Sequence, residues 1–350
     1  MKKLMAVLLA LVMVLSLAAC GAEPEASIAT AEKDAEAKPA EQAQELTKIS
    51  VAYMPNWGAL WAVATADAKG YFAEEGLDID LVVFEDGPTE IAAMESGAID
   101  ISYIGPGAHK LCSTGNAQVF LLQHLDQGDF IIGLNGVKSL EDLKGKKVGY
   151  AAGTASETIL INALDSVGLT MDDIEALSMD ATALTTAALS GSVDAVSAWN
   201  PFAITILAEA AGAVQLANNV DFPSMVSPGS WVVNPKWAAE NHDIMVRFTR
   251  AMYKGMDYAA PAATDDAIAE EVAGYVAAVI KGDPTVVLDQ RYDGAWKTKQ
   301  DIINYCESGE MLQLFADQQD TFIAGGAVDA ATALDPSEFV LVDVMTEAAK

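Results

Sequence analysis

The sequence has few of the residues that metal sites, redox sites and nucleic-acid surfaces require. It contains three cysteines and three histidines in 350 residues, and their spacing fits no metal-ligand pattern. A disulfide between Cys112 and Cys306 is allowed but not implied, and two buried thiols are the simpler interpretation. Lysine and arginine number 20 against 50 acidic residues, for a net charge of −30. Because phosphate binding needs a basic surface, we exclude nucleic acid as a partner.

Signatures of catalysis and of membrane spanning are also missing. There is no Gly-x-Ser-x-Gly turn and no nucleophile paired with a base at recognisable spacing. After the first 19 residues, no stretch is long and apolar enough to cross a bilayer. These absences favour a binding protein without cofactors over an enzyme, and an exported chain over a membrane-spanning one.

The beginning of the chain has the pattern of an export signal. Lys2 and Lys3 precede an apolar run over 4–19, which ends in small residues. The run closes with LAAC and Gly21, which resembles the lipobox of bacterial lipoproteins. This resemblance implies cleavage before Cys20, a lipid on its thiol, and anchoring to the outer face of the cytoplasmic membrane. A plain signal peptide with an incidental cysteine is the alternative.

The segment that follows Cys20 predicts a flexible tether. Residues 21–46 are almost all alanine, glutamate, lysine, glutamine and proline, with no aromatic residue. Such a segment buries too little apolar surface to offset the entropy of ordering it. Without Lys2 and Lys3, the exported chain has 18 basic and 50 acidic residues, a net charge of −32.

One passage of the sequence occurs twice. SGAIDISYIGPG over 96–107 is matched by SGSVDAVSAWNP over 190–201, and each copy follows a helix-like run. Each contains a short apolar strand that ends at a proline-containing turn. The strands KISVAYMP (48–55) and KKVGYAAG (146–153) open the two units in the same way. The repetition predicts an α/β fold with two doubly wound, largely parallel lobes.

The pattern also gives boundaries for the expected parts of the chain. These are a signal peptide (1–19), a lipidated cysteine and tether (20–46), the first part of lobe 1 (47–135), lobe 2 (136–229) and a return to lobe 1 with C-terminal helices (230–350). The expected helices include 59–75, 108–114, 156–167, 201–211, 237–258 and 265–280.

Candidate ligand contacts follow from where the expected strands end, because ligands of such sheets bind at the carboxyl ends of the strands. The turns 105–107 and 199–201 should both face a cleft between the lobes. In GTASET (153–158), a helix N-terminus and hydroxyls suggest an anion site, although Glu157 would repel an anion placed too close. The candidates are Asn56, Trp57, Trp61, Gly105, Pro106, His124, Thr154, Ala155, Ser156, Trp199, Asn200 and Trp231.

Several longer passages resemble a known family. WAVATADAKGYFAEEGLDIDLVVFEDG (61–87), SLEDLKGKKVGYAAGTASE (139–157) and LSGSVDAVSAWNPF (189–202) are similar to ABC-importer substrate-binding proteins of the nitrate, sulfonate, taurine and thiamine-precursor class. The resemblance implies a periplasmic-binding-protein type II fold with a hinged cleft. It also implies a small-molecule ligand, and an ABC permease with its ATPase as partners of a monomeric binding protein.

The sequence leaves the ligand open. The resemblance favours a sulfonate such as taurine, but all three arginines fall after residue 246, away from the expected cleft turns. Four candidate cleft tryptophans suit an aromatic, pyrimidine or amine-bearing ligand instead. Two alternatives of another class are a thiamine-pyrimidine-synthase-like enzyme, whose His and Cys clusters are lacking here, and a surface scaffold or adhesin.

Overall fold

A computed structural model describes residues 46–222 and 225–350. The predicted signal peptide, Cys20 and nearly all of the predicted tether lie outside the described residues. The described chain falls in one compact unit that begins at Gln44. Within the described chain, no helix is both long and apolar enough to cross a membrane.

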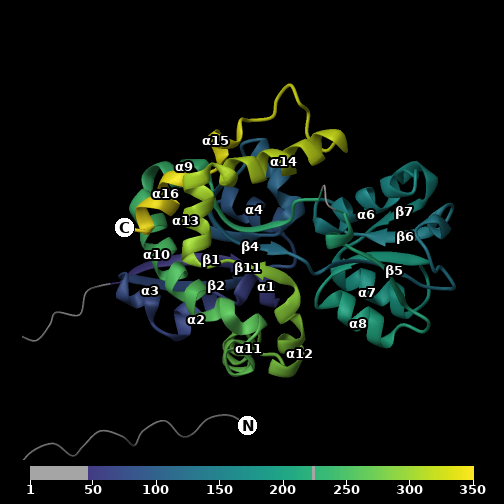
Figure 1. The fold of residues 1–350 in the computed structure, drawn as a ribbon, viewed down its shortest axis with the longest axis horizontal. Coiled ribbons are helices and arrows are strands. Elements are labelled where there is room, and N and C mark those ends of the chain that lie inside the picture. Colours follow the sequence, from purple (N-terminus) through teal and green to yellow (C-terminus); the bar gives the residue numbers. More distant parts are fainter. Residues whose placement is uncertain (1–45, 223–224) are drawn as a thin grey trace, which may run out of the picture. The chain divides into compact units, whose positions relative to one another are not determined.

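The first lobe is built on a mixed sheet with the strand order β11-β4-β10-β3-β1-β2 (Figure 1). β1, β2 and β3 are parallel, whereas β10 runs antiparallel to both β3 and β4, and β11 antiparallel to β4. The strands are β1 (Thr47–Tyr53), β2 (Leu77–Val83), β3 (Ile101–Ile104), β4 (Gln118–Asp126), β10 (Pro228–Val233) and β11 (Gly294–Trp296).

The second lobe has its own mixed sheet, ordered β7-β6-β8-β5-β9. β6 pairs parallel with β7 and β8, and β5 pairs antiparallel with β8 and β9. The strands are β5 (Asp129–Gly133), β6 (Lys147–Tyr150), β7 (Glu175–Ser178), β8 (Ala195–Trp199) and β9 (Val214–Asn218). Two α/β lobes are therefore confirmed, but each sheet mixes strand directions where we expected mainly parallel pairing.

The chain passes between the sheets at two places. The first crossing is at 127–128, between β4 and β5, and the second is at 219–227, between β9 and β10. Both differ slightly from the expected boundaries at 135/136 and 229/230. The first differs because β5 pairs within the second sheet, and the second because β10 of the first sheet already begins at Pro228. Asn219 Nδ2 donates to the Asp126 carbonyl at 2.7 Å, so the two crossings are hydrogen-bonded to each other.

Helices cover both sheets (Figure 1). The longer helices of the first lobe are α4 (Gly87–Glu95), α10 (His242–Ala259), α11 (Asp266–Ile280), α13 (Lys299–Ser308) and α14 (Glu310–Ala324). The short ones are α1 (Trp57–Leu60), α2 (Val63–Ala68), α3 (Tyr71–Glu74), α5 (Lys110–Ser113), α9 (Pro235–Glu240), α12 (Pro284–Leu288), α15 (Pro336–Phe339) and α16 (Val342–Ala348). The second lobe has α6 (Ala155–Ser166), α7 (Ala181–Leu189) and α8 (Phe202–Glu209). Short 3-10 turns include η1 (Pro106–His109), η4 (Asn219–Asp221) and η6 (Asp289–Tyr292).

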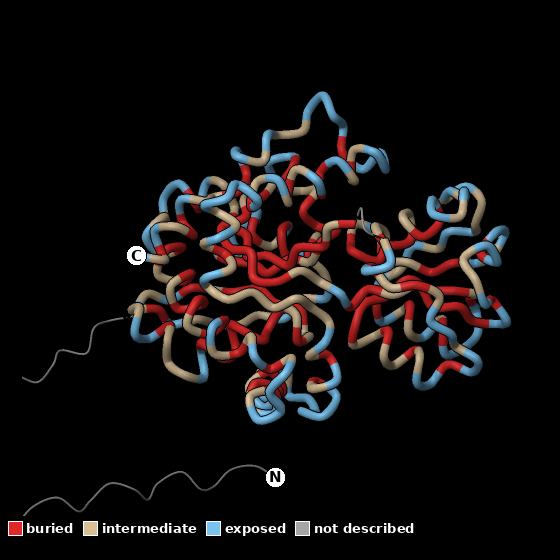
Figure 2. Tube along the Cα trace, viewed as in Figure 1, coloured by how far each residue is buried: buried red, intermediate tan, exposed pale blue. Residues whose placement is uncertain are grey.

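The core follows the alternation of side chains along the strands. The inner strands β3, β8 and β10 are buried throughout, whereas edge strands such as β7 are largely exposed (Figure 2). In β5, Ile132 packs with α7 and α8 on one face of the second sheet. Its neighbour Ile131 packs with α6 on the other face. Successive residues of β5 thus pack into cores on opposite faces of the sheet. A shift by one residue would exchange the two faces, so this packing fixes the register of β5.

Two expected helices are interrupted. The single helix predicted over 59–75 is divided into α1, α2 and α3, with Gly70 at a φ of 77° between the last two. That left-handed conformation ends one helix and starts the next, and glycine adopts it without steric cost. The helix predicted over 237–258 is split at Asn241 into α9 and α10. Most residues of both segments are helical, as expected, but the sequence did not predict the breaks within them.

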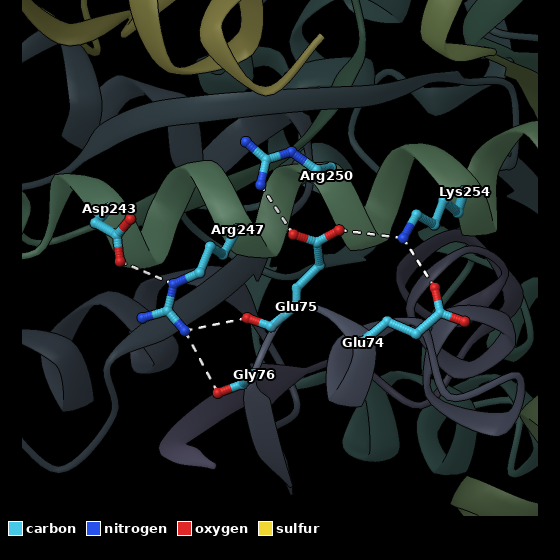
Figure 3. A network of polar contacts seen from close by, with 7 residues as sticks. All are labelled: Glu74, Glu75, Gly76, Asp243, Arg247, Arg250 and Lys254. Carbon is cyan, nitrogen blue, oxygen red and sulfur yellow. Dashed lines mark hydrogen bonds and ion pairs between the residues drawn. The ribbon is translucent and has the colours of Figure 1, made fainter. Parts of the chain in front are cut away.

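Basic side chains on one face of α10 hold the turn between α3 and β2 (Figure 3). Glu75 receives Arg250 Nη1 at 2.9 Å on one carboxylate oxygen and Lys254 Nζ at 3.1 Å on the other. Arg247 Nη1 donates to the backbone carbonyls of Glu75 and Gly76 at 3.1 and 3.4 Å. Because the side chain of Glu75 is only 11% exposed, these ion pairs are partly shielded from water.

Glu75→Gln is therefore expected to destabilise the first lobe. The change removes the charge from a shielded ion-pair network, and we expect a loss of roughly 1 kcal/mol in the free energy of unfolding. Urea unfolding at low and high salt measures it, and the loss should shrink at high salt. Glu74→Gln is the matched control, because Glu74 pairs with Lys254 from a mostly exposed position. Equal losses in the two variants would contradict this interpretation.

Candidate functional site

A cleft of about 400 Å³ lies where the two sheets meet. Its walls come from strand ends and helix starts of both lobes. The first lobe contributes Met54, Asn56, Asp86, Gly87, Pro88, Tyr103, Gly105, Pro106, Ala108 and Asp126, and the second contributes Asp129, Thr154, Ala155 and Trp199. Small-molecule sites are often found at such boundaries between two lobes.

A second cavity of about 290 Å³ adjoins the first and shares Asn56, Tyr103, Asp126 and Trp199 with it. It extends toward the crossing at 127–128. Its other lining residues are Gly58, His124, Gly128, Asn200, Gln290 and Asp293. The two cavities therefore form one continuous site between the lobes.

The lobes touch each other around this site. Asn200 Nδ2 donates to both carboxylate oxygens of Asp293, at 2.8 and 2.9 Å. On another side, Lys110 of α5 pairs with Glu157 of α6 at 3.0 Å. Gly107 lies so close to the backbone of Thr154 that a Cβ at Gly107 would lie 2.1 Å from the Thr154 carbonyl carbon. These contacts are those of a closed cleft.

Carboxylates dominate the electrostatics of the site. Burial raises the pKa of Asp126 to about 6, and burial raises that of Asp293 to about 7. The pKa of Asp129 is raised well above its usual range, first by burial and then by the charges of Asp126 and Asp293. No lysine or arginine is among the described residues that line either cavity. An anion therefore finds no basic side chain in the described lining, whereas a bound cation would favour the ionised form of these carboxyl groups.

Eight of the twelve candidates from the sequence line this site. They are Asn56, Gly105, Pro106, His124, Thr154, Ala155, Trp199 and Asn200. The two repeated turns meet there because β3 and β8 each end at the boundary between the lobes. Asn56 also caps α1, since its Oδ1 accepts from Ala59 N at 2.8 Å. Burial lowers the pKa of His124 to about 3, so His124 is neutral.

Three predicted cleft tryptophans lie in the core instead. Trp57, Trp61 and Trp231 are fully buried and line neither cavity. Trp57 and Trp61 share a helix face, as expected, but that face packs on Trp296, with ring centroids 6.3 and 5.2 Å away. Trp231 Nε1 donates to Gln123 Oε1 at 2.9 Å. These residues were candidates because they lie close to strand ends in the sequence. That position does not determine the direction in which a side chain points.

The predicted anion site at the start of α6 is already engaged by protein groups. Thr154 is the N-cap, and its Oγ1 accepts from Ser156 N at 3.2 Å. Glu157 accepts from Gly153 N at 2.9 Å. Ser156, the fourth candidate outside the lining, is buried and donates to the Ser197 carbonyl at 2.8 Å. Because the Glu157 carboxylate already occupies this helix end, an anion gains less there than the sequence suggested.

The acidic residues of the site were missed. Asp126 follows the segment QVFLLQHL (118–125) directly, and Asp129 comes three residues later. Their positions near a strand end could have made them candidates, as for His124. No pattern in the sequence around Asp293 indicated that it would lie in this site. It enters the site because β11 pairs with β4, which places Gly294 opposite Asp126. Among the described residues, no group of three His, Cys, Asp or Glu side chains is arranged to hold a metal ion.

Comparison with known proteins gives a family and a fold. Residues 59–264 match the family model described as NMT1/THI5 like. A Brucella abortus protein named as a binding protein is 29% identical over 299 residues, covering 85% of this chain and 91% of its own length. A Bacillus subtilis protein named as an aliphatic sulfonates-binding protein is 28% identical over 200 residues, covering 55% of this chain and 60% of its own.

Solved structures agree with this assignment. The alkanesulfonate-binding protein SsuA from Xanthomonas axonopodis, solved with bound MOPS, superposes with a TM-score of 0.63 at 18% identity. The match covers 85% of this chain and 98% of that one. The resemblance and the fold class predicted from the sequence are confirmed. The two relatives reported above are binding proteins by name, in agreement with the expectation of a protein that is not an enzyme.

Proposed function

The chain belongs to the NMT1/THI5-like family, and on that premise we propose that it is an extracytoplasmic solute-binding protein of an ABC importer. It captures a small organic ligand between its lobes and delivers it to a permease driven by an ATPase. The observation that supports this most directly is a cleft whose walls come from both lobes. A ligand that contacts both walls favours the closed arrangement.

The proposed location follows from the start of the sequence. A signal peptide over 1–19 would export the chain, and lipidated Cys20 would anchor it to the outer face of the cytoplasmic membrane. Residues 21–46 would then act as a tether between the anchor and the binding lobes. The binding protein would work as a monomer, with the importer as its membrane partner.

Two ligand classes remain in this proposal. A taurine-like sulfonate is supported by the name of the Bacillus subtilis relative. An aromatic, pyrimidine or amine-bearing ligand is supported by the aromatic walls Tyr103 and Trp199 and by the acidic lining. Taurine belongs to both classes, because it carries an ammonium group as well as a sulfonate.

A screen of small solutes tests the function. A ligand that binds the folded state alone stabilises it by about 2.7 kcal/mol at a concentration of 100 times its Kd. We therefore expect a solute-specific, saturable rise in Tm, together with a decrease in radius of gyration by X-ray scattering as the lobes close. Solutes should be recovered chemically unchanged. Turnover of a bound solute, or saturable binding of none, would contradict the proposal.

A further inference from the structure

The site contains a carboxylate with no partner. Asp129 begins β5, is fully buried and lines the cleft. Neither of its carboxylate oxygens has a hydrogen-bond partner among the described residues. Nearly all buried polar groups of folded proteins are hydrogen-bonded, so an unpaired buried carboxylate requires an explanation.

A second carboxylate, that of Asp126, also favours a positive charge in the cleft. It lies on the other side of the crossing at 127–128, and its charge is close enough to raise the pKa of Asp129. Asp126 Oδ1 accepts from Gly128 N at 2.7 Å, whereas Asp293 is engaged by Asn200. Two carboxylates, one from each lobe, thus face a cavity whose described lining supplies no basic side chain.

The remaining walls indicate what kind of cation fits. Met54, Tyr103 and Trp199 line the same cavity, and aromatic faces attract organic ammonium groups. A bare divalent metal fits less well, because the described residues provide no three-residue metal cluster. An ammonium group bound to an apolar or aromatic body satisfies both the carboxylates and the walls.

We propose that the cleft selects an organic cation, whose protonated amine or quaternary ammonium group is held between Asp126 of the first lobe and Asp129 of the second. This inference rests on the proposed function, since it names the ligand class of the same site. A cation bound by both lobes neutralises their mutual repulsion and thereby favours closure. An anion without an amine gains neither effect.

Matched pairs of solutes test the inference by calorimetry on the exported protein. Each pair compares an amine or ammonium compound with a counterpart that lacks this group: taurine with ethanesulfonate, choline with dimethylbutanol, and benzylamine with benzyl alcohol. At least one cationic solute should bind about 100-fold more tightly than its counterpart, the effect of one desolvated charge pair.

The second test of the inference uses the variant Asp129→Asn. It should weaken binding of the cationic solute by about 100-fold. Asp165→Asn, an equal change of charge at an exposed position of α6, should leave binding unchanged. Circular dichroism and thermal unfolding establish that both variants are folded.

The outcomes separate the two claims. An amine-free solute that binds as tightly as its cationic counterpart, or an Asp129→Asn variant with unchanged affinity, would overturn the organic cation and leave the solute-binding function standing. Absence of saturable binding by all six solutes would count against both. If Asp165→Asn also lost binding, the effect of Asp129→Asn would come from the net charge of the protein. The proposed role of Asp129 would then be wrong.

Discussion

Gly107→Ala is expected to hold the lobes apart and to weaken ligand binding by at least about 100-fold. Gly107 lies in η1, directly after β3 of the first sheet. A Cβ at this position would lie 2.1 Å from the carbonyl carbon of Thr154 and 2.2 Å from its oxygen. Both of these Thr154 atoms belong to the backbone, so rotation of a side chain cannot relieve the clash. The closed arrangement therefore excludes any residue larger than glycine at position 107.

The stability of this variant should change much less than its affinity. Rotation of one lobe against the other, at the connections between the sheets, would separate the two surfaces without unfolding either sheet. We expect the free energy of unfolding to stay within about 1 kcal/mol of the parent value, as for most substitutions that avoid strain. X-ray scattering with a solute that closes the parent protein should show the variant remaining open.

Gly274→Ala is the control for this experiment. Gly274 lies in α11, and a Cβ there would meet nothing within 4 Å. Its replacement should leave binding unchanged and stabilise the helix slightly, because alanine favours the helical backbone more than glycine. If Gly107→Ala closes normally and keeps its affinity, the contact with Thr154 does not belong to the ligand-bound state.

Asp129→Asn is expected to stabilise the ligand-free protein at neutral and alkaline pH. The Asp129 carboxyl group is buried and without a hydrogen-bond partner among the described residues. Replacing a buried, unsatisfied polar group of this kind should stabilise the folded state by about 1–3 kcal/mol. The same substitution removes the proposed contact with the ligand. If Asp129→Asn is more stable than the parent without ligand and also binds ligand poorly, Asp129 is retained for function rather than for stability.

The pH dependence gives this prediction a definite sign. The folded-state pKa of Asp129 is raised well above its ordinary value of 3.8, so the folded state binds a proton more readily than the unfolded state. The stability that this proton contributes is present below about pH 4 and is lost as the pH rises through the folded-state pKa. Asp126 and Asp293, with raised pKa values of about 6 and 7, contribute with the same sign.

The parent protein should therefore lose stability between about pH 4 and pH 8, and Asp129→Asn should lose less. Chemical unfolding at several pH values measures the difference, which should grow with pH. The pKa of the nearby Tyr103 is raised by burial and then by the charges of Asp126, Glu90 and Asp129, so Tyr103 stays neutral in this window. A difference that is constant with pH would show that Asp129 does not titrate there.

Much of the fold was predictable because it depends on local patterns. Alternating apolar residues predicted β1 and β6, and the repeated passage predicted β3 and β8 with the turns that follow them. These patterns work because a strand end and a proline turn are properties of neighbouring residues. The antiparallel pairing of β5 and β10 was not visible, since it depends on residues that are distant in the sequence.

By itself, the sequence determined the two lobes, the family and the approximate position of the cleft. Only the tertiary structure decided which side chains face that cleft. Trp57 and Trp61 turn toward Trp296, because burial of large aromatic rings in the core is more favourable than exposure at a wall. Asp293 joins Asp126 and Asp129 from a segment over 160 residues further along the chain, because pairing of β11 with β4 brings it there. Side-chain direction and long-range pairing are set by packing of the whole chain, which no local pattern records.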